Sequence, residues 1–341
     1  MSNQRIWLVR SGFALGILGL VLFGRTAALT ENAQTDQAGS GASASASSES
    51  DRAAIRAHRV ALELVQSWQL NLPQGERFDA SGLYEQRDGT LLTVSDREAA
   101  VYQIELLSGT NSANLVKIPD CFTPAQLAPF ANEKLDRYDI EGVAGDEQGR
   151  LYLCEEINRW ILRWDSTTRK VERLNIDWSP VRKYFHPTDN NASFEGIAIG
   201  GGRIYVANER QSGRIIVVDQ KTLKIIDDFM PRPSTAALGD IHYSDLSWFG
   251  GHLYVLLRHH KVVLEIEPSS HAVMAEFTFG AIEDAPEAAY RKFLPTGTME
   301  GLAVDKDFIW LATDNNGFAR VKFPKDIRPT LFKCRHPGSN L

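Results

Sequence analysis

The sequence YDIEGVAGDEQGRLYLCEE at residues 138–156 contains two short apolar segments joined by a polar turn, and it decides the fold. Near the start of the first segment, the acidic residue Glu141 is followed by Gly142. The second alternates aliphatic and aromatic residues and ends in Glu155 and Glu156. Alternation on both sides of a turn rich in Gly and Asp is typical of a β-hairpin. A single hairpin is marginally stable in water, so the fold depends on whether the pattern recurs.

The same hairpin occurs five times along the chain. The other copies are FDASGLYEQRDGTLLTVSDRE at 78–98, SFEGIAIGGGRIYVANER at 193–210, HYSDLSWFGGHLYVLLRHH at 242–260 and TMEGLAVDKDFIWLATDNNG at 298–317. Equivalent positions are held by Gly82, Gly142, Gly196, Asp245 and Gly301. Their spacing is roughly 50 to 60 residues, somewhat more than a compact four-stranded blade requires, which indicates insertions.

Further apolar segments lie where a third strand would follow each hairpin. They are VYQIEL from 101, WILRWD from 160, RIIVVD from 214 and VVLEIEP from 262. A four-stranded unit repeated about five times predicts an all-β fold, a β-propeller with blades around a central channel. A six-bladed ring with one degenerate repeat is the alternative. Ring closure is expected between residues 76–83 and a C-terminal strand near Val321.

The N-terminal region carries the features of an exported protein. Arg5 and Arg10 precede an apolar run at 12–24, and small residues follow, so residues 1–28 are interpreted as a signal peptide or a signal anchor. Residues 29–50 are a low-complexity linker rich in Ser, Ala and Gly. Residues 51–72 are expected to form a short N-terminal helix, and residues 73–341 the propeller. We expect a periplasmic or secreted protein, anchored if the apolar segment is retained.

Charge and cysteine content limit the partners. The formal net charge of −6 disfavours nucleic acid, so membrane contact is expected only through an N-terminal anchor. We expect a monomer whose partner is a small anionic substrate or an envelope protein. The three cysteines, Cys121, Cys154 and Cys334, permit at most one internal disulfide, and Cys121 with Cys334 is the more plausible pair.

Acidic residues recur at the ends of the hairpin strands. In an antiparallel hairpin the start of the first strand and the end of the second lie at the same edge, so these residues should meet at one mouth of the channel. Oxygen ligands without paired His or Cys select Ca²⁺ first and Mg²⁺ second. The expected metal ligands are Glu141, Glu195, Asp245, Glu300, Glu156 and Asp314. Capping of strand ends is the competing interpretation, in which neighbouring arginines neutralise the acids.

Basic residues also end two of the hairpins. Arg210 and Arg258 could bind a phosphoryl or carboxylate group beside a cation, and Glu209 is the best-placed general base. These three residues are the expected catalytic set. His186 and His242 have no partner at ligand spacing, so neither is expected to bind zinc.

The hairpins resemble the phytase-like propeller family, named for the esterase-like activity of phytase, and the related SdiA-regulated periplasmic propellers. The matching segments are DIEGVAGDEQGRLYLCEE, FEGIAIGGGRIYVANER, SDLSWFGGHLYVLL and MEGLAVDKDFIWLATDN. The resemblance implies an exported, calcium-linked propeller, with phosphoester or ester hydrolysis suspected in some members. It points to Glu141, Glu195, Asp245 and Glu300 with Glu156, Glu209 and Asp314, whereas the first hairpin departs from the pattern at Ser81.

Two functions therefore stand side by side. One is a calcium-dependent hydrolase of phosphoester or ester bonds. The other is a non-catalytic, calcium-stabilised propeller that binds a protein or an envelope component. Turnover of phosphate esters with and without calcium would distinguish them.

Overall fold

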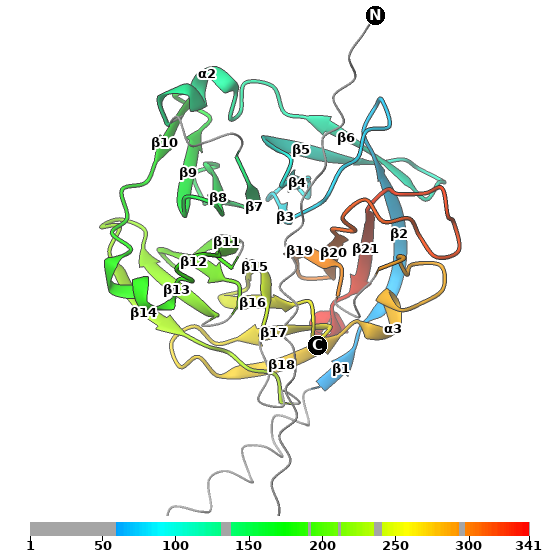
Figure 1. The fold of residues 1–341 in the computed structure, drawn as a ribbon. Coiled ribbons are helices and arrows are strands. Elements are labelled where there is room, and N and C mark those ends of the chain that lie inside the picture. The colour runs from blue at the N-terminus through cyan, green and yellow to red at the C-terminus, as the bar shows by residue number, and fades with distance from the viewer. Residues whose placement is uncertain are drawn as a thin grey trace, which may run out of the picture. The chain divides into compact units, whose positions relative to one another are not determined.

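The repeated hairpins form the inner strands of a β-propeller in the computed structural model, which describes residues 59–130, 138–189, 192–210, 213–234, 241–292 and 297–340 (Figure 1). The expected signal segment and linker lie outside these residues. No helix among the residues described is long and apolar enough to cross a membrane.

Strand pairing divides the described strands into five four-stranded units, here called blades 1 to 5. Blade 1 contains β3 (Gly82–Glu85), β4 (Leu91–Ser95), β5 (Glu98–Leu106) and β6 (Ser112–Lys117). Blade 2 contains β7 (Ile140–Gly145), β8 (Leu151–Glu155), β9 (Trp160–Asp165) and β10 (Lys170–Arg173). Blade 3 contains β11 (Phe194–Gly200), β12 (Arg203–Asn208), β13 (Arg214–Asp219) and β14 (Ile225–Phe229).

Blade 4 contains β15 (Tyr243–Phe249), β16 (His252–Leu257), β17 (Val262–Ile266) and β18 (Val273–Thr278), with β1 (Arg59–Ala61) added in parallel to β18. Blade 5 contains β19 (Met299–Val304), β20 (Phe308–Thr313), β21 (Thr330–Arg335) and β2 (Glu63–Asn71). The helical elements are short: α2 (Pro124–Leu127), α3 (Gly280–Glu283), η1 (Ala128–Phe130), η2 (Ser179–Tyr184) and η3 (Pro337–Asn340). The hairpins and third strands expected from the sequence are confirmed.

The first strand of each hairpin is the innermost strand of its blade. These strands touch in a closed cycle, β3 to β7, β11, β15, β19 and back to β3, around the centre seen in Figure 1. Apolar side chains of neighbouring blades pack between the sheets, as in the cluster that joins Tyr205 and Ala207 of blade 3 to Leu253 and Val255 of blade 4. The core therefore lies between blades, which holds the inner strand ends in fixed positions.

The repeated glycines close the centre of the ring. A Cβ atom on Gly82 would lie 2.9 Å from Cα of Gly142, and one on Gly196 would lie 2.6 Å from Cα of Asp245. Only a residue without a side chain permits this approach at those positions. Asp245 occupies the equivalent place on β15, and its carboxylate is fully buried. The central channel expected from the sequence is thus blocked at the level of these residues.

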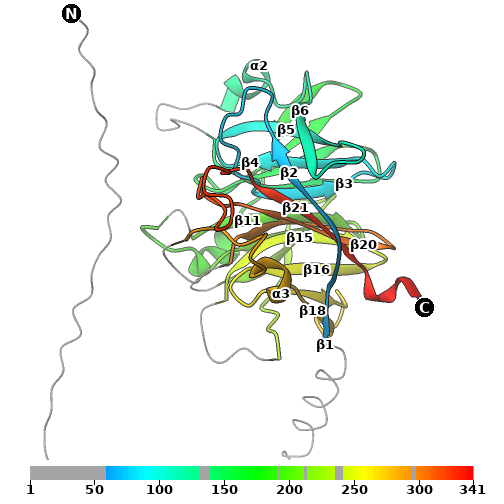
Figure 2. The same ribbon diagram turned by 90° about the vertical axis from the view of Figure 1, so that its right-hand side faces the viewer.

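The segment before the first hairpin forms a strand, so the helix expected over 51–72 is wrong for the part that the structure describes. β2 pairs antiparallel with β21 and parallel with β6, which joins blades 5 and 1 into one eight-stranded sheet. Trp68 and Leu70, two residues apart, are buried against blades 1 and 5. A period of two suits a pleated strand, and this pairing outweighs the local helix preference. β2, rather than residues 76–83, closes the ring (Figure 2).

The cysteines do not form the expected disulfide. Cys121, Cys154 and Cys334 are all free and buried. Cys121 packs in the core between blades 1 and 2, while Cys334 packs in the core between blades 4 and 5. Two thiols in separate cores cannot approach to bonding distance, so the pair Cys121 and Cys334 is excluded.

Candidate metal centre and its arginine pair

A β-bulge lies at the start of four inner strands, and in three of them it carries a glutamate. The register shifts between Ile140 and Gly142, between Phe194 and Gly196, between Tyr243 and Asp245, and between Met299 and Gly301. The extra residues are Glu141, Glu195, Ser244 and Glu300. A bulge re-aims the side chain that it carries, and this one recurs at the same place in blades 2 to 5.

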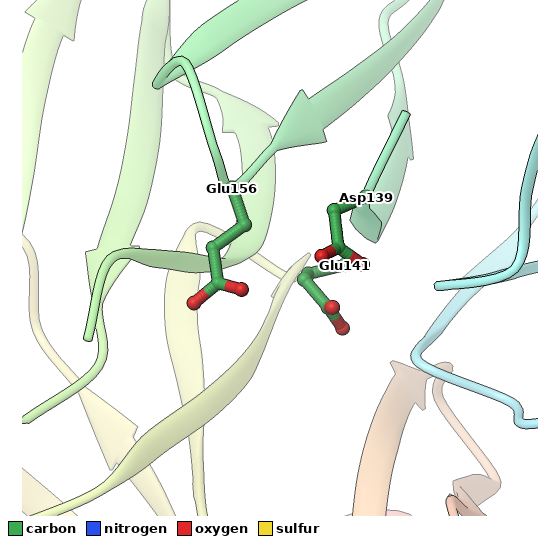
Figure 3. Close-up of side chains that lie close together, drawn as sticks. All are labelled: Asp139, Glu141 and Glu156. Atoms are coloured by element: carbon green, nitrogen blue, oxygen red, sulfur yellow. The ribbon is translucent and has the colours of Figure 1, made fainter. Parts of the chain in front are cut away.

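Three of these bulge residues converge. Glu141, Glu195 and Glu300 each offer one carboxylate oxygen to a group whose members all lie within 4.8 Å of one another. Their exposed fractions are 8%, 5% and 5%. A second group with the same spacing contains Asp139, Glu141 and Glu156, whose side chains appear together in Figure 3. Glu141 belongs to both groups, so the two form one acidic centre.

Burial keeps protons on this centre when no cation is bound. Burial first, and then the charges of neighbouring carboxylates, raise the pKa of Glu141 and Glu195 well above the usual range. The same causes, with Glu209 as the leading charge, raise the pKa of Glu156 to about 9. One oxygen of Glu156, Oε1, is buried without a hydrogen-bond partner. Oxygen donors that repel one another suit a hard cation, so the residues present fit Ca²⁺.

Arg258 links this centre to Glu209. Its guanidinium forms an ion pair with Glu300 through Nη1 and donates to Oε1 of Glu209 through Nη2 at 2.7 Å. Glu209 also accepts from Arg210, which in turn reaches Asp189 at 3.2 Å. Burial raises the pKa of Glu209, but the hydrogen bond from His242 and the charges of Arg258 and Arg210 outweigh it and leave that pKa lowered. Glu209 is therefore a paired carboxylate.

Comparison with family models matches residues 78–317 to the Phytase-like family, described as "Esterase-like activity of phytase". This match spans more than half of the chain. The chain belongs to the Phytase-like family. None of the curated proteins matches its sequence.

Solved structures similar to this Phytase-like chain include several enzymes. A glutaminyl cyclase from Myxococcus xanthus is 15% identical with a TM-score of 0.53, over 82% of this chain and 97% of that one. A luciferin-regenerating enzyme is 10% identical with a TM-score of 0.45, over 81% and 95%. A PQQ-bound aldose sugar dehydrogenase from Streptomyces coelicolor is 13% identical with a TM-score of 0.42, over 80% and 98%. At these identities, the likeness to the glutaminyl cyclase shows the fold alone.

Two other expected ligands of the Phytase-like chain, Asp245 and Asp314, accept hydrogen bonds from backbone N–H groups. Asp245 follows the bulge residue of blade 4, so the residue equivalent to Glu141 is Ser244. The Asp245 carboxylate accepts hydrogen bonds from the backbone N–H groups of Leu83, Leu246 and Leu302. Asp314 is buried and accepts from the N–H of Asn316 at 2.6 Å. Neither belongs to the groups of three close ligands found among the described residues.

His242 is a site residue that the sequence did not identify. It precedes β15 at the position that Asp139 holds before β7, and its Nδ1 lies 3.0 Å from Oε1 of Glu209. Its ring packs on His259 with centroids 3.8 Å apart. The repeat alignment alone could have placed His242 beside the acidic mouth, because it shares the blade position of Asp139. Its contact with Glu209 joins blade 4 to blade 3, and no pattern within either hairpin predicts that contact. His186 instead accepts from backbone N–H groups in its own turn.

Proposed function

We propose that this chain is an exported, calcium-dependent hydrolase of phosphoester or ester bonds. The observation that carries the proposal is the convergence of Glu141, Glu195 and Glu300 directly beside the buried guanidinium of Arg258. A cation site next to a fixed arginine suits a substrate that carries an anionic or developing anionic oxygen. Bound calcium would neutralise the carboxylates and polarise a phosphoryl or ester oxygen.

The calcium ligands in this proposal are Glu141, Glu195 and Glu300, with Asp139 and Glu156 completing the centre. Arg258 and Arg210 bind the oxygens of the substrate, and their geometry is set by Glu209, which holds one nitrogen of each guanidinium. A fixed guanidinium loses little freedom when it binds, so the pair is prepared for an anion.

His242, rather than Glu209, serves as the general base in this mechanism. Glu209 accepts from two arginines and from His242, so its oxygens already have partners. A proton held on Nδ1 of His242 by Glu209 makes Nε2 the basic nitrogen, which takes a proton from the attacking water. Glu209 thereby orients the base and stabilises its charged form.

An activity assay of the purified chain, with calcium and with a chelator, tests the proposal. Its substrates are phosphate monoesters, phosphate diesters and carboxylic esters. We expect turnover only with calcium, and its loss in Glu195→Gln. The matched control is Glu105→Gln, an exposed position on blade 1 that should leave the rate unchanged. Absence of turnover on all three substrate classes would reject the hydrolase.

The second candidate is a calcium-stabilised binding module, and the burial of the centre favours it. Exposed fractions of 5 to 8% at Glu141, Glu195 and Glu300 leave little carboxylate surface for a substrate. In that case calcium raises the melting temperature without turnover, because a ligand of the native state stabilises it.

Export is proposed from the sequence of residues 1–28, with retention as an anchor as the alternative. Cell fractionation of the full chain, followed by N-terminal sequencing of the recovered protein, tests it. A protein recovered from the cytoplasm with residues 1–28 intact would contradict export.

A further inference from the structure

A cavity lies at the end of the propeller opposite the acidic centre, and it is called the second cavity here because it is the second candidate site. It has a volume of about 890 Å³ and is lined by residues of all five blades, at the ends of the inner strands where the hairpins turn. Its floor includes Leu83, Val143, Ile197 and Leu246, each of which directly follows one of the ring-closing residues. The acidic centre sits at the other end of the same strands.

The two ends are separated by the closed centre of the ring. The Asp245 carboxylate, which is fully buried, bridges blade 4 to N–H groups of blades 1 and 5 at 3.1 and 2.7 Å. A Cβ atom on Gly82 or on Gly142 would lie within 3.1 Å of the next glycine's Cα, so the inner strands pack directly against one another here. None of the residues of the acidic centre lines the second cavity, which is therefore a site of its own.

Aromatic rings form part of its wall because glycines make room for them. Tyr84 lies over Gly145, where a Cβ atom would stand 2.4 Å from the tyrosine hydroxyl. Trp248 lies over Gly200 in the same way and stacks on Tyr205 with centroids 5.5 Å apart. Tyr84 and Trp248, from blades 1 and 4, both line the cavity. They offer apolar surface that prefers a flat or aliphatic group to water.

The charge of the cavity is predominantly negative. Six acidic residues line it: Glu85, Asp88, Asp146, Glu147, Asp305 and Asp307. Three basic residues oppose them, and two of these are engaged, since Lys306 pairs with Asp307 and Lys333 lies over the rings of Phe308 and Trp310. Carboxylates in a concave, low-dielectric wall concentrate their field, which attracts cations and repels anions.

Glu85 is a half-buried carboxyl group of this wall that lies beside a second carboxylate, Asp305. Its Oε2 is buried without a hydrogen-bond partner. Asp305, whose charge acts on Glu85, already accepts from the N–H groups of Asp307 and Phe308 and from the Trp310 indole. Burial, then the charge of Asp305, raises the pKa of Glu85 to about 8. A positively charged group beside the Glu85 carboxylate in the cavity would offset the charge of Asp305, because it supplies an opposite charge.

We propose that the second cavity binds a protonated organic amine, whose ammonium group donates to Glu85 and whose apolar body packs on Trp248 and Tyr84. Aromatic faces and carboxylates together favour such a ligand over an anion, and the ammonium hydrogens distinguish it from a quaternary cation. This inference is independent of the proposed hydrolase, since the two sites lie at opposite ends of the ring.

The proposal is tested by measuring the binding of 2-phenylethylammonium to the full chain at pH 7. Calorimetry and tryptophan fluorescence measure this binding. The matched neutral probe is 2-phenylethanol, which has the same apolar body without the charge. We expect the amine to bind at least about tenfold more tightly than the alcohol, which is the effect of one charge-assisted hydrogen bond. Equal binding of the two probes, or no binding of the amine at millimolar concentration, would overturn the proposal.

Variants locate the bound amine. Glu85→Gln should weaken the amine about tenfold and leave the alcohol unchanged, and Trp248→Leu should weaken both probes. Glu141→Gln, at the opposite end, should change neither affinity. The melting temperature of each variant verifies that it is folded. If Trp248→Leu is destabilised, Glu85→Gln still carries the test, because loss of folded protein cannot change the ratio of the two probe affinities. Loss of amine binding in Glu141→Gln, with Glu85→Gln unaffected, would place the amine at the acidic centre and reject the second site.

Discussion

Asp245 occupies the ring-closing position at which the other four repeats have glycine, and its side chain holds three blades together. Its carboxylate accepts from Leu83 of blade 1, Leu302 of blade 5 and Leu246 of its own strand. Burial raises its pKa well above the usual range, even though the three N–H groups lower it. An acid in this position serves the fold, which is why it is absent from the acidic groups at the mouth.

Replacement of Asp245 by glycine restores the residue found in the other four repeats, yet we expect it to destabilise the protein. The N–H groups of Leu83 and Leu302 would lose their acceptor in a place that water cannot reach, at a cost of about 2 to 5 kcal/mol. Asp245→Asn keeps one oxygen acceptor and should cost less than half as much. Chemical denaturation of both variants measures the difference, and an Asp245→Gly protein as stable as the parent would contradict the role of this residue.

His242 can be tested through the reaction of the proposed hydrolase. Replacement by Asn should lower kcat about 10²- to 10⁴-fold with little change in KM, since it removes a proton acceptor rather than a binding group. His252→Asn is the control, because that ring lies at the other end of blade 4 and pairs with Glu265. A His242→Asn enzyme with the parental kcat would exclude His242 as the base.

Strand β2 shows how the ends of the chain complete the ring. It contributes the outermost strand of blade 5 and touches β6 of blade 1, so a segment from the start of the domain locks its last blade. One face is buried through Trp68 and Leu70, while Leu64 and Val65 remain exposed. Such a closure makes the stability of the whole ring depend on one strand.

Two substitutions within β2 test this dependence. Leu70→Asp places a charge at a side chain that is 1% exposed, and should destabilise by about 3 to 5 kcal/mol. Val65→Asp changes a position that is 45% exposed, and should stay within about 0.5 kcal/mol. Urea denaturation of the pair provides the comparison. Equal effects at the two positions would mean that β2 does not pack as a blade strand.

The sequence was sufficient for the elements that repeat. Each hairpin carries its own turn and its own alternation, so the propeller, the inner strands and the mouth where Glu141, Glu195 and Glu300 meet follow from local patterns. The segment 59–71 was misassigned because it lacks a repeat partner and its strand form depends on pairing with β21, far along the chain. The role of Asp245 was missed for a related reason. The alignment of the repeats sets Asp245 against the glycines and Ser244 against Glu141, but the burial of the Asp245 carboxylate between three blades depends on contacts outside its own hairpin.

At the scale of the whole propeller, the closed centre separates two chemically different ends. One end gathers buried glutamates beside arginines, and the other has aromatic walls and excess carboxylates. Because the packed centre of the ring lies between the two ends, calcium at the first should stabilise the fold without altering the shape of the second. We therefore expect 2-phenylethylammonium to bind with the same affinity in calcium and in chelator, as measured by calorimetry. A calcium-dependent affinity would show coupling through the strands.

The stability of the propeller should depend on pH in a way that calcium reverses. Glu156, with a pKa raised to about 9, and Asp314, raised to about 7, hold protons in the folded state that the unfolded chain releases near pH 4. The folded state binds more protons, so its stability falls as pH rises through this range.

Between pH 6.5 and 9 the melting temperature should therefore decrease in chelator. Calcium binds the deprotonated carboxylates, and at a concentration of about 100 times its Kd it would add about 2.7 kcal/mol. The calcium-dependent rise in melting temperature should then be larger at pH 9 than at pH 6.5, and should largely vanish in Glu141→Gln. Thermal denaturation at both pH values, with calcium and with chelator, measures all four conditions. A calcium effect of equal size at the two pH values would contradict binding at these carboxylates, because such binding must compete with their protons.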